Sequence, residues 1–351
     1  MRKFRINKRV VSEDSRPYII AEIGVNHGGS IKKARMLVRL AKEGGADAVK
    51  FQTYKAETLA CKSSPSYWDL AKEPTRSQYM LFKKYDSFNK KDFFELGEYA
   101  KKIKIDFLST PFDDDSVDFL APIIPCFKIA SADITNTPFL RKIASKRMPV
   151  ILSTGASTLS EINSAIKELE VHGAESIALL HCILNYPTAY ENAHLNVIKN
   201  LLKRYPNKVI GYSDHCLPDD SMLVLTAAYF FGARILEKHF TYDKSLQGND
   251  HYHAMDIKDL KKFVNQLDFA RKLEGTHNRK PLPTEGISRK NARRSIVTKT
   301  KIKAGARLTE NSLTCKRPGT GISPLYWDRV IGKKAKRDLE EDFALSWADI
   351  V

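Results

Sequence analysis

Two histidines end neighbouring apolar segments of the chain and could together hold a metal ion. The segments are VIGYSDH, which ends at His215, and ARILEKH, which ends at His239. A short apolar, β-prone run predicts a buried strand, and a polar residue at its end lies at the rim of the sheet. Imidazole is a frequent ligand of divalent metals, so two adjacent rims could share one ion. For this pair alone, two histidines that only make hydrogen bonds at strand ends remain an open alternative.

Two lysines lie inside other apolar segments. Lys50 is in DAVKFQT and Lys128 is in CFKIAS. A lysine is costly to bury without a partner, so both are expected to face polar groups or a ligand. The companion segments end in hydroxyl side chains that would add neutral donors, namely Thr110, Ser131, Ser153 and Ser213. This combination suits a small molecule that carries a phosphate and a carboxylate. The alternative is that each lysine pairs with a carboxylate such as Glu22 or Glu237.

Carboxylates at other segment ends could handle protons or hydroxyl groups. Glu22 lies near the end of YIIAEIG and is the candidate for moving protons of water or of a hydroxyl group, with a purely structural pairing to lysine as the alternative. The loop GNDHYHAM contains Asp250 and His253. Histidines in loops usually face solvent, so we expect Asp250 to accept a hydroxyl group and expect no metal role for His253.

A histidine and a cysteine are adjacent in SIALLHC, at His181 and Cys182. Such a pair could suggest a thiol nucleophile with its base. Adjacent residues on a strand point to opposite faces, however, so these two side chains cannot act on each other. We therefore expect structural roles for both. Asn185 and Tyr186 follow this segment and are candidates for substrate contacts.

The elements that must position these residues form a regular alternation. Apolar strand candidates occur at 18–24, 47–53, 105–111, 126–131, 149–155, 176–182, 208–214 and 233–240, and helical patterns separate most of them. Continuous apolar strands that alternate with helices predict a parallel sheet with both faces covered. Eight such units in about 250 residues predict a (β/α)₈ TIM barrel, with its site at the carboxyl ends of the strands. An open doubly wound sheet is the alternative, but no G-x-G-x-x-G follows the first strand.

The chain divides into a large and a small part. We predict a barrel domain over 1–275, a polar, proline-containing linker over 276–291 and a small β-rich domain over 292–351. In this tail, IKAGARLTENSL (302–313) aligns without gaps on LEEDFALSWADI (339–350), which predicts a pseudo-symmetric domain. Within the barrel, the long excursion at 54–90 is expected to cover the substrate.

Composition limits the class of protein. The formal net charge of the 351 residues is +17, but the lysines are mixed with acids along helical stretches. We see no nucleic-acid recognition motif, so we expect small anions as partners rather than nucleic acid. No apolar stretch is long enough to span a membrane, and the basic amino-terminal segment does not resemble a secretory signal. Five scattered cysteines indicate reduced thiols and a cytoplasmic location.

Nine motifs, in this order along the chain, resemble the sialic acid synthase family. They are AEIGVNHGG, KFQTY, STPFD, KIASADITN, ILSTGAS, HCILNYPT, IGYSDH, EKHFT and KRPGTGISP. The resemblance runs from about residue 16 to the carboxyl terminus. It implies a TIM barrel followed by an antifreeze-like (SAF) domain, in a homodimer where one tail covers the partner's barrel. It also implies condensation of phosphoenolpyruvate with an N-acylated hexosamine to give a nine-carbon ulosonic acid and phosphate.

The resemblance implies a role for each matching position. His215 and His239 would hold Mn²⁺ or a similar ion such as Mg²⁺ or Co²⁺. Phosphoenolpyruvate would contact Lys50, Thr110, Lys128, Ser131, Ser153, Asn185 and Ser213. The sugar would contact Glu22, Gln52, Tyr186 and Asp250, with Arg317 reaching it from the partner subunit. Glu22, Lys50 and Lys128 are the expected catalytic residues.

The substrate implied is N-acetylmannosamine or a 2,4-diacetamido-trideoxyhexose. The same chemistry on another sugar, or on N-acetylmannosamine 6-phosphate, is the alternative. An aldolase is the nearest enzymatic rival, and it would need a Schiff-base lysine or a zinc triad. A sugar- or ice-binding protein built around the tail is the non-enzymatic rival. The basic tail lacks a flat threonine array, which argues against that rival.

Overall fold

The computed structural model describes residues 2–248, 250–276 and 278–351. These form two compact units, Met1–Glu274 and Gly275–Val351. Inside the predicted linker, the structure has the short helix α11 (Gly286–Ala292). None of the helices formed by the described residues combines the length and apolar character needed to cross a membrane.

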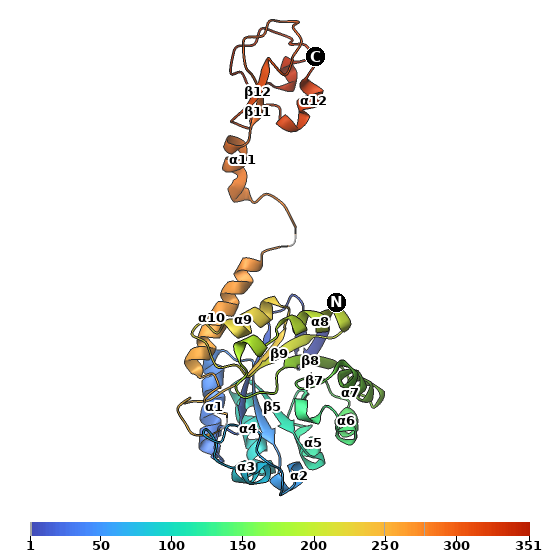
Figure 1. Ribbon diagram of the computed structural model, residues 1–351, viewed down its shortest axis with the longest axis vertical. Helices are drawn as coiled ribbons and strands as arrows, with labels where there is room; N and C mark the ends of the chain where they lie inside the picture. The colour runs from blue at the N-terminus through green and yellow to red at the C-terminus, as the bar shows by residue number, and fades with distance from the viewer. Residues whose placement is uncertain (1, 249, 277) are drawn as a thin grey trace. The chain divides into compact units, whose positions relative to one another are not determined.

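The first unit is the predicted (β/α)₈ barrel (Figure 1). Its parallel strands are β3 (Tyr18–Gly24), β4 (Ala48–Thr53), β5 (Asp106–Pro111), β6 (Phe127–Ile129), β7 (Val150–Ser153), β8 (Ile177–Cys182), β9 (Ile210–Asp214) and β10 (Ile235–His239). They follow the order β5-β4-β3-β10-β9-β8-β7-β6, and β5 also lies beside β6, so the sheet curves round on itself. All eight predicted strands are confirmed.

Helices surround the strands and bury their outward faces (Figure 1). They are α1 (Ile31–Gly44), α4 (Lys90–Lys102), α5 (Asp114–Leu120), α6 (Thr137–Ala144), α7 (Leu159–Val171), α8 (Asn196–Arg204), α9 (Leu223–Phe230) and α10 (Ile257–Glu274). Capping side chains define several helix starts. In α7, Thr158 accepts a hydrogen bond from the N–H of Glu161, whose carboxylate accepts one from Thr158 in return. Such local signals fix where each helix begins and therefore where each strand must end.

An amino-terminal hairpin closes the other end of the barrel. Strands β1 (Lys3–Ile6) and β2 (Arg9–Ser12) pair antiparallel. Phe4, Ile6 and Val11 are buried against the inward-facing residues of the strands, in a cluster separate from the one under the helices. The hairpin therefore packs against the end of the barrel opposite the carboxyl ends of the strands. This hairpin was not among the predicted strands.

The excursion after β4 carries two short helices, α2 (Ala56–Leu59) and α3 (Gln78–Tyr85). Trp68 is buried and anchored, because its indole N–H donates to the carbonyl groups of Glu73 and Thr75 at 3.0 and 3.1 Å. The segment is thus an ordered part of the barrel unit.

The second unit contains α11, β11 (Ser295–Thr298), β12 (Leu313–Lys316) and α12 (Trp327–Val330), and it buries its own apolar cluster. Equivalent positions of the predicted repeat behave alike. Gly305 and Asp342 both have left-handed φ angles, of 80° and 60°, and Leu308 and Leu345 are both fully buried. Because matching positions share backbone conformation and burial, the repeat reflects two similar halves.

Candidate active site

A cavity of about 440 Å³ lies at the carboxyl ends of the barrel strands, within the size range of small-molecule sites. Most of the predicted site residues line it, namely Glu22, Lys50, Gln52, Thr110, Lys128, Ser131, Ser153, Tyr186, Ser213, His215 and His239. They come from seven different strands and the loops that follow them, as expected for this barrel. Asn185 is instead exposed, and the cavity wall there is formed by its neighbours Leu184 and Tyr186.

Lys50 is buried between a carboxylate and a hydroxyl group. Its Nζ lies 2.6 Å from Glu22 Oε2 and donates to Thr110 Oγ1 at 3.1 Å. Gln52 Nε2 donates to Glu22 Oε1 at 3.3 Å and so holds the other carboxylate oxygen. Lys50 therefore pairs with Glu22, as the structural alternative proposed, yet both groups still line the open cavity.

Lys128 faces the same cavity from β6. Its Nζ donates to Ser153 Oγ at 2.6 Å. Glu237 Oε1 lies 3.8 Å from Nζ of both Lys128 and Lys50, and it accepts a hydrogen bond from Ser213 at 2.9 Å. From the sequence, Glu237 was expected only as a carboxylate that could pair with a lysine. The structure makes it the carboxylate that joins the two lysines.

Burial and mutual charge set the protonation of this cluster. Burial raises the pKa of Glu22 to about 7, although Lys50 opposes the shift. Burial alone would also raise the pKa of Glu237, but the ammonium groups of Lys128 and Lys50 outweigh it and lower that pKa. Burial lowers the pKa of Lys128, with Glu237 opposing. Near neutral pH the cavity can therefore gain a positive charge when Glu22 takes up a proton.

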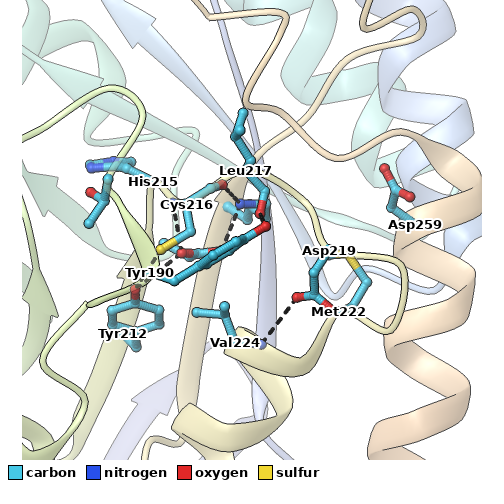
Figure 2. A network of polar contacts seen from close by, with 12 residues as sticks. Tyr190, Tyr212, His215, Cys216, Leu217, Asp219, Met222, Val224 and Asp259 are labelled. Carbon is cyan, nitrogen blue, oxygen red and sulfur yellow. Dashed lines mark hydrogen bonds and ion pairs between the residues drawn. The ribbon is translucent and has the colours of Figure 1, made fainter. Parts of the chain in front are cut away.

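A polar network holds the loop that carries His215 (Figure 2). Asp214 accepts hydrogen bonds from the Tyr212 hydroxyl at 3.1 Å and from the Cys216 N–H at 3.0 Å. Its other oxygen pairs with Lys238 at 2.6 Å, and both residues are almost fully buried. His215 Nδ1 lies 2.7 Å from the carbonyl oxygen of Ile183. When Nδ1 donates to that carbonyl, Nε2 of His215 is left as a free ligand atom.

The predicted histidine pair comes together, and a third histidine joins it. The rings of His215 and His239 lie 5.5 Å apart, and those of His239 and His253 lie 4.8 Å apart. Ligand atoms of His239, Asp250 and His253 all lie within 4.8 Å of one another. Burial, with His253 and His215 nearby, lowers the pKa of His239 well below its usual value. The expectation that His253 faces solvent is wrong, because its side chain is fully buried.

Two further groups at this end come from β8 and its loop. Tyr186 places its ring 4.2 Å from that of His215. Cys182 lines the cavity with Sγ 3.8 Å from His215 Nδ1, while His181 faces the other side and contacts the Ala193 carbonyl oxygen at 2.8 Å. Burial raises the pKa of the Cys182 thiol to about 11. A protonated thiol is a poor nucleophile, which agrees with the structural role expected for Cys182.

A second, smaller pocket adjoins the first and shares Gln52, Tyr186 and His239 with it. Its wall is largely aromatic and comes from the excursion after β4, with Tyr54, Tyr67, Trp68, Phe82 and Tyr85. Asp250 and His251 complete it, and none of the described residues that line it is a lysine or arginine. The sequence indicated a cover here, and the structure shows that its aromatic side chains face the site.

Arg317, the predicted site residue of the tail, is exposed in the second unit.

Comparison with known proteins covers both units. The model of the NeuB family matches residues 37–279, and that of the SAF domain matches 293–351. The N,N'-diacetyllegionaminic acid synthase of Legionella pneumophila is 39% identical over 95% of this chain and 94% of that protein. The Campylobacter jejuni protein of the same name is 38% identical over 92% and 97%. The crystal structure of the N-acetylneuraminic acid synthetase from Leptospira borgpetersenii in complex with citrate has a TM-score of 0.72 and 33% identity, covering 82% of this chain and 95% of that one.

Proposed function

The chain belongs to the NeuB family and is a carbon–carbon bond-forming synthase of the sialic acid type, and we propose that it joins phosphoenolpyruvate to an uncharged N-acylated hexosamine. The products are a nine-carbon ulosonic acid and phosphate. A 2,4-diacetamido-trideoxyhexose is the first choice of sugar, and N-acetylmannosamine is the second. The same reaction on a sugar phosphate is the alternative.

The pair of buried lysines in one cavity carries this proposal. Lys50 and Lys128 each lie 3.8 Å from the same Glu237 oxygen, so their ammonium groups flank one small space. A molecule with a phosphate and a carboxylate can bridge two such charges. The hydroxyl groups of Thr110 and Ser153 contact the two lysines, and that of Ser213 contacts Glu237, so all three can serve as further hydrogen-bonding partners. Because both ammonium groups are almost fully buried, these charge-assisted contacts are stronger than they would be at the surface.

The histidine pair fits a divalent metal. His215 has Nδ1 engaged by the Ile183 carbonyl, which orients Nε2 as a ligand. The buried Nδ1 of His239 has no hydrogen-bond partner within the described part of the chain. Such a donor set suits Mn²⁺ or Co²⁺, with Mg²⁺ a weaker fit to nitrogen ligands. When bound, the ion would polarise a sugar aldehyde as a Lewis acid.

The aromatic pocket supports an uncharged sugar. A phosphorylated hexosamine would need a basic partner, and the described residues that line this pocket include no lysine or arginine. Aromatic faces instead suit apolar acetamido methyl groups and sugar C–H faces. The two relatives with the legionaminic name are consistent with a second acetamido group on the sugar. Asp250 and Gln52 lie where they can bind sugar hydroxyl groups.

The residues then support a balanced reaction. Carbon 3 of phosphoenolpyruvate bonds to the aldehyde carbon, and the aldehyde oxygen takes a proton from Glu22. Water then adds at carbon 2 and returns a proton to Glu22, since this carboxylate reaches the cavity beside Lys50. The carbon–oxygen bond to phosphate breaks, the new hydroxyl group at carbon 2 becomes the keto group, and its proton leaves with the phosphate. Lys50 and Lys128 stabilise the departing anion.

Phosphate release tests the proposal directly. The full-length protein is incubated with phosphoenolpyruvate and each candidate sugar, with Mn²⁺ or with EDTA, in water enriched in ¹⁸O. We expect metal-dependent phosphate release with an uncharged sugar, and label in the ulosonic acid rather than in the phosphate. Release that is unaffected by EDTA, label in the phosphate, or turnover only with the 6-phosphate would each overturn part of the proposal. Trapping of substrate by borohydride would favour the aldolase instead.

A further inference from the structure

A third imidazole lies at the proposed metal site. His253 is fully buried, and its ring is 4.8 Å from that of His239 and 6.5 Å from that of His215. Its ligand atom lies within 4.8 Å of those of His239 and Asp250. Two nitrogen atoms bound to one ion, each about 2.1 Å from it, are at most about 4.2 Å apart. The observed separation is therefore within a small side-chain movement of metal ligation.

The backbone around His253 is anchored on both sides. The Tyr252 hydroxyl donates to the Tyr186 carbonyl oxygen at 2.8 Å, and the Met255 N–H donates to the His239 carbonyl oxygen at 2.8 Å. The first contact ties the loop to the residue that packs on His215, and the second ties it to His239 itself. His253 is thereby held next to the histidine pair before any ligand arrives, as a preorganised site requires.

The neighbouring histidine of the same loop has a different environment. His251 Nδ1 lies 2.8 Å from the Thr241 hydroxyl, and its side chain is half-buried on the wall of the aromatic pocket. His251 therefore provides an internal control, because it differs from His253 in position but not in residue type or loop.

We propose that His253 is a third protein ligand of the metal, so that the ion is held by three imidazoles beside the Asp250 carboxylate. This inference rests on the proposed function, since it concerns the same ion. A third nitrogen ligand shifts the metal selectivity of the site toward Co²⁺, Zn²⁺ and other ions that favour imidazole, and away from Mg²⁺. It also fixes the ion in the absence of sugar. Asp250 then presents its carboxylate to a sugar hydroxyl group directly beside the ion.

The first experiment counts nitrogen ligands in the unmodified protein. Metal-free full-length protein is loaded with Mn²⁺ without substrate, and pulsed electron paramagnetic resonance measures the number of coordinated imidazole nitrogens. Three nitrogens are expected, whereas two would overturn the inference. This readout needs no variant and does not move if His253 only packs against the ligands.

The second experiment places a reporter atom at position 253. With Co²⁺, His253→Cys should give a sulfur-to-cobalt charge-transfer band above that of the wild type, and His251→Cys should not. His253→Ala should weaken Co²⁺ binding by at least about 10-fold, while His251→Ala leaves it unchanged. The inference fails if no band appears in a His253→Cys protein that folds and binds Co²⁺.

These outcomes separate the inference from the proposed function. Metal-dependent phosphate release with only two coordinated imidazoles would leave the reaction standing and remove His253 from the site. Three imidazoles without phosphate release from any sugar would do the reverse. A wild-type protein that binds no divalent ion would overturn both the metal requirement and this ligand set.

Discussion

Lys128 is the buried lysine whose removal should affect phosphoenolpyruvate most directly. Its ammonium group contacts Ser153 and Glu237 inside the cavity. Lys128→Met keeps most of the side-chain volume but removes the charge, and a charge-assisted hydrogen bond contributes roughly 1.5–3 kcal/mol. We expect kcat/KM for phosphoenolpyruvate to fall at least about 10-fold, with the KM for sugar unchanged. Initial rates of phosphate release, with each substrate varied in turn, measure both.

The control for this change is Lys101→Met, at an exposed lysine of α4. It should leave the kinetic constants for both substrates unchanged, because this lysine is exposed and lies beside the start of β5, not among the residues of the 440 Å³ cavity. Equal losses for phosphoenolpyruvate and sugar in Lys128→Met would contradict a specific role in binding the anion.

His27 should make the barrel sensitive to acid. Burial lowers its pKa from 6.5 to about 4, its ring stacks on Phe88 at 4.1 Å, and its Nδ1 accepts the Gly29 N–H at 3.1 Å. The unfolded chain takes up this proton near pH 6.5 and the folded chain only near pH 4. The stability from neutral His27 is therefore complete above pH 6.5 and is lost as the pH falls toward 4, by about 3 kcal/mol.

The variant His27→Phe isolates this contribution. It keeps the stacking but lacks the titrating group, and it leaves the Gly29 N–H without its acceptor at a cost of about 1 kcal/mol. Urea unfolding of metal-free protein between pH 4 and 8 should show a smaller loss toward acid in the variant than in the wild type. If the free energy of unfolding fell equally with pH in the two proteins, His27 would not be the source of the acid sensitivity.

At the residue scale, lysines inside apolar strands, together with hydroxyl groups and histidines at strand ends, were enough to predict which side chains meet in one cavity, because the strands converge in a barrel. It was not enough for His253. This residue lies in a loop, and its ring contacts Tyr186 and His239, which are distant in sequence. The role of Glu237 was also underestimated, since its distance to both lysines depends on how three strands meet.

At the scale of elements, the ion pair between β9 and β10 should hold the metal-binding loop. Lys238 is almost fully buried, and Asp214 is its carboxylate partner. Asp214→Asn would leave a buried ammonium group uncompensated, which typically destabilises a fold by 3–5 kcal/mol, that is, roughly 4 kcal/mol here. It also weakens the support under His215, so we expect metal affinity to fall as well. Chemical denaturation and metal titration measure the two effects.

Two comparisons sharpen that test. Adding Lys238→Met to Asp214→Asn should restore part of the stability, because it removes the unpaired charge. Asp118→Asn breaks an exposed pairing with Lys142 and Lys146. It should leave the denaturant concentration at half-unfolding almost unchanged. A large loss of stability in Asp118→Asn, or no recovery of stability in the double variant, would argue against the buried unpaired charge as the cause of the destabilisation.

The order of strands and helices could be predicted from apolar runs and helical periodicity. Each element buries one face, and the spacing of apolar residues in the sequence shows that face. The hairpin β1–β2 escaped prediction for a physical reason. Its two strands have only four residues each, with lysine and arginine alternating with buried Phe4 and Ile6 in β1 and a single buried residue, Val11, in β2. Such a short, charged pattern indicates a strand only once the barrel end that it covers is known.

At the scale of the whole molecule, the second unit has its own buried core and carries Arg317 on its surface. We propose that this guanidinium contacts the sugar bound to the barrel of a second copy of the chain. Arg317→Ala should raise the KM for sugar at least about 10-fold, as for other lost charge-assisted contacts, and leave phosphoenolpyruvate binding unchanged. Calorimetric titration measures the affinity for phosphoenolpyruvate, and kinetics with varied sugar measure the KM for sugar. Equal weakening of phosphoenolpyruvate binding and of sugar use would count against a role in sugar binding.

Mixing two defective proteins decides whether Arg317 acts within its own chain or on its partner. Lys50→Met damages the barrel site and keeps the tail, whereas Arg317→Ala keeps the barrel site and alters the tail. If the tail acts on the partner, a mixed dimer contains one intact site, built from the barrel of the second variant and the tail of the first. Random exchange at equal amounts gives half mixed dimers, so about a quarter of wild-type activity should return. If each tail serves its own barrel, every site keeps one defect and no activity returns, however complete the exchange of subunits.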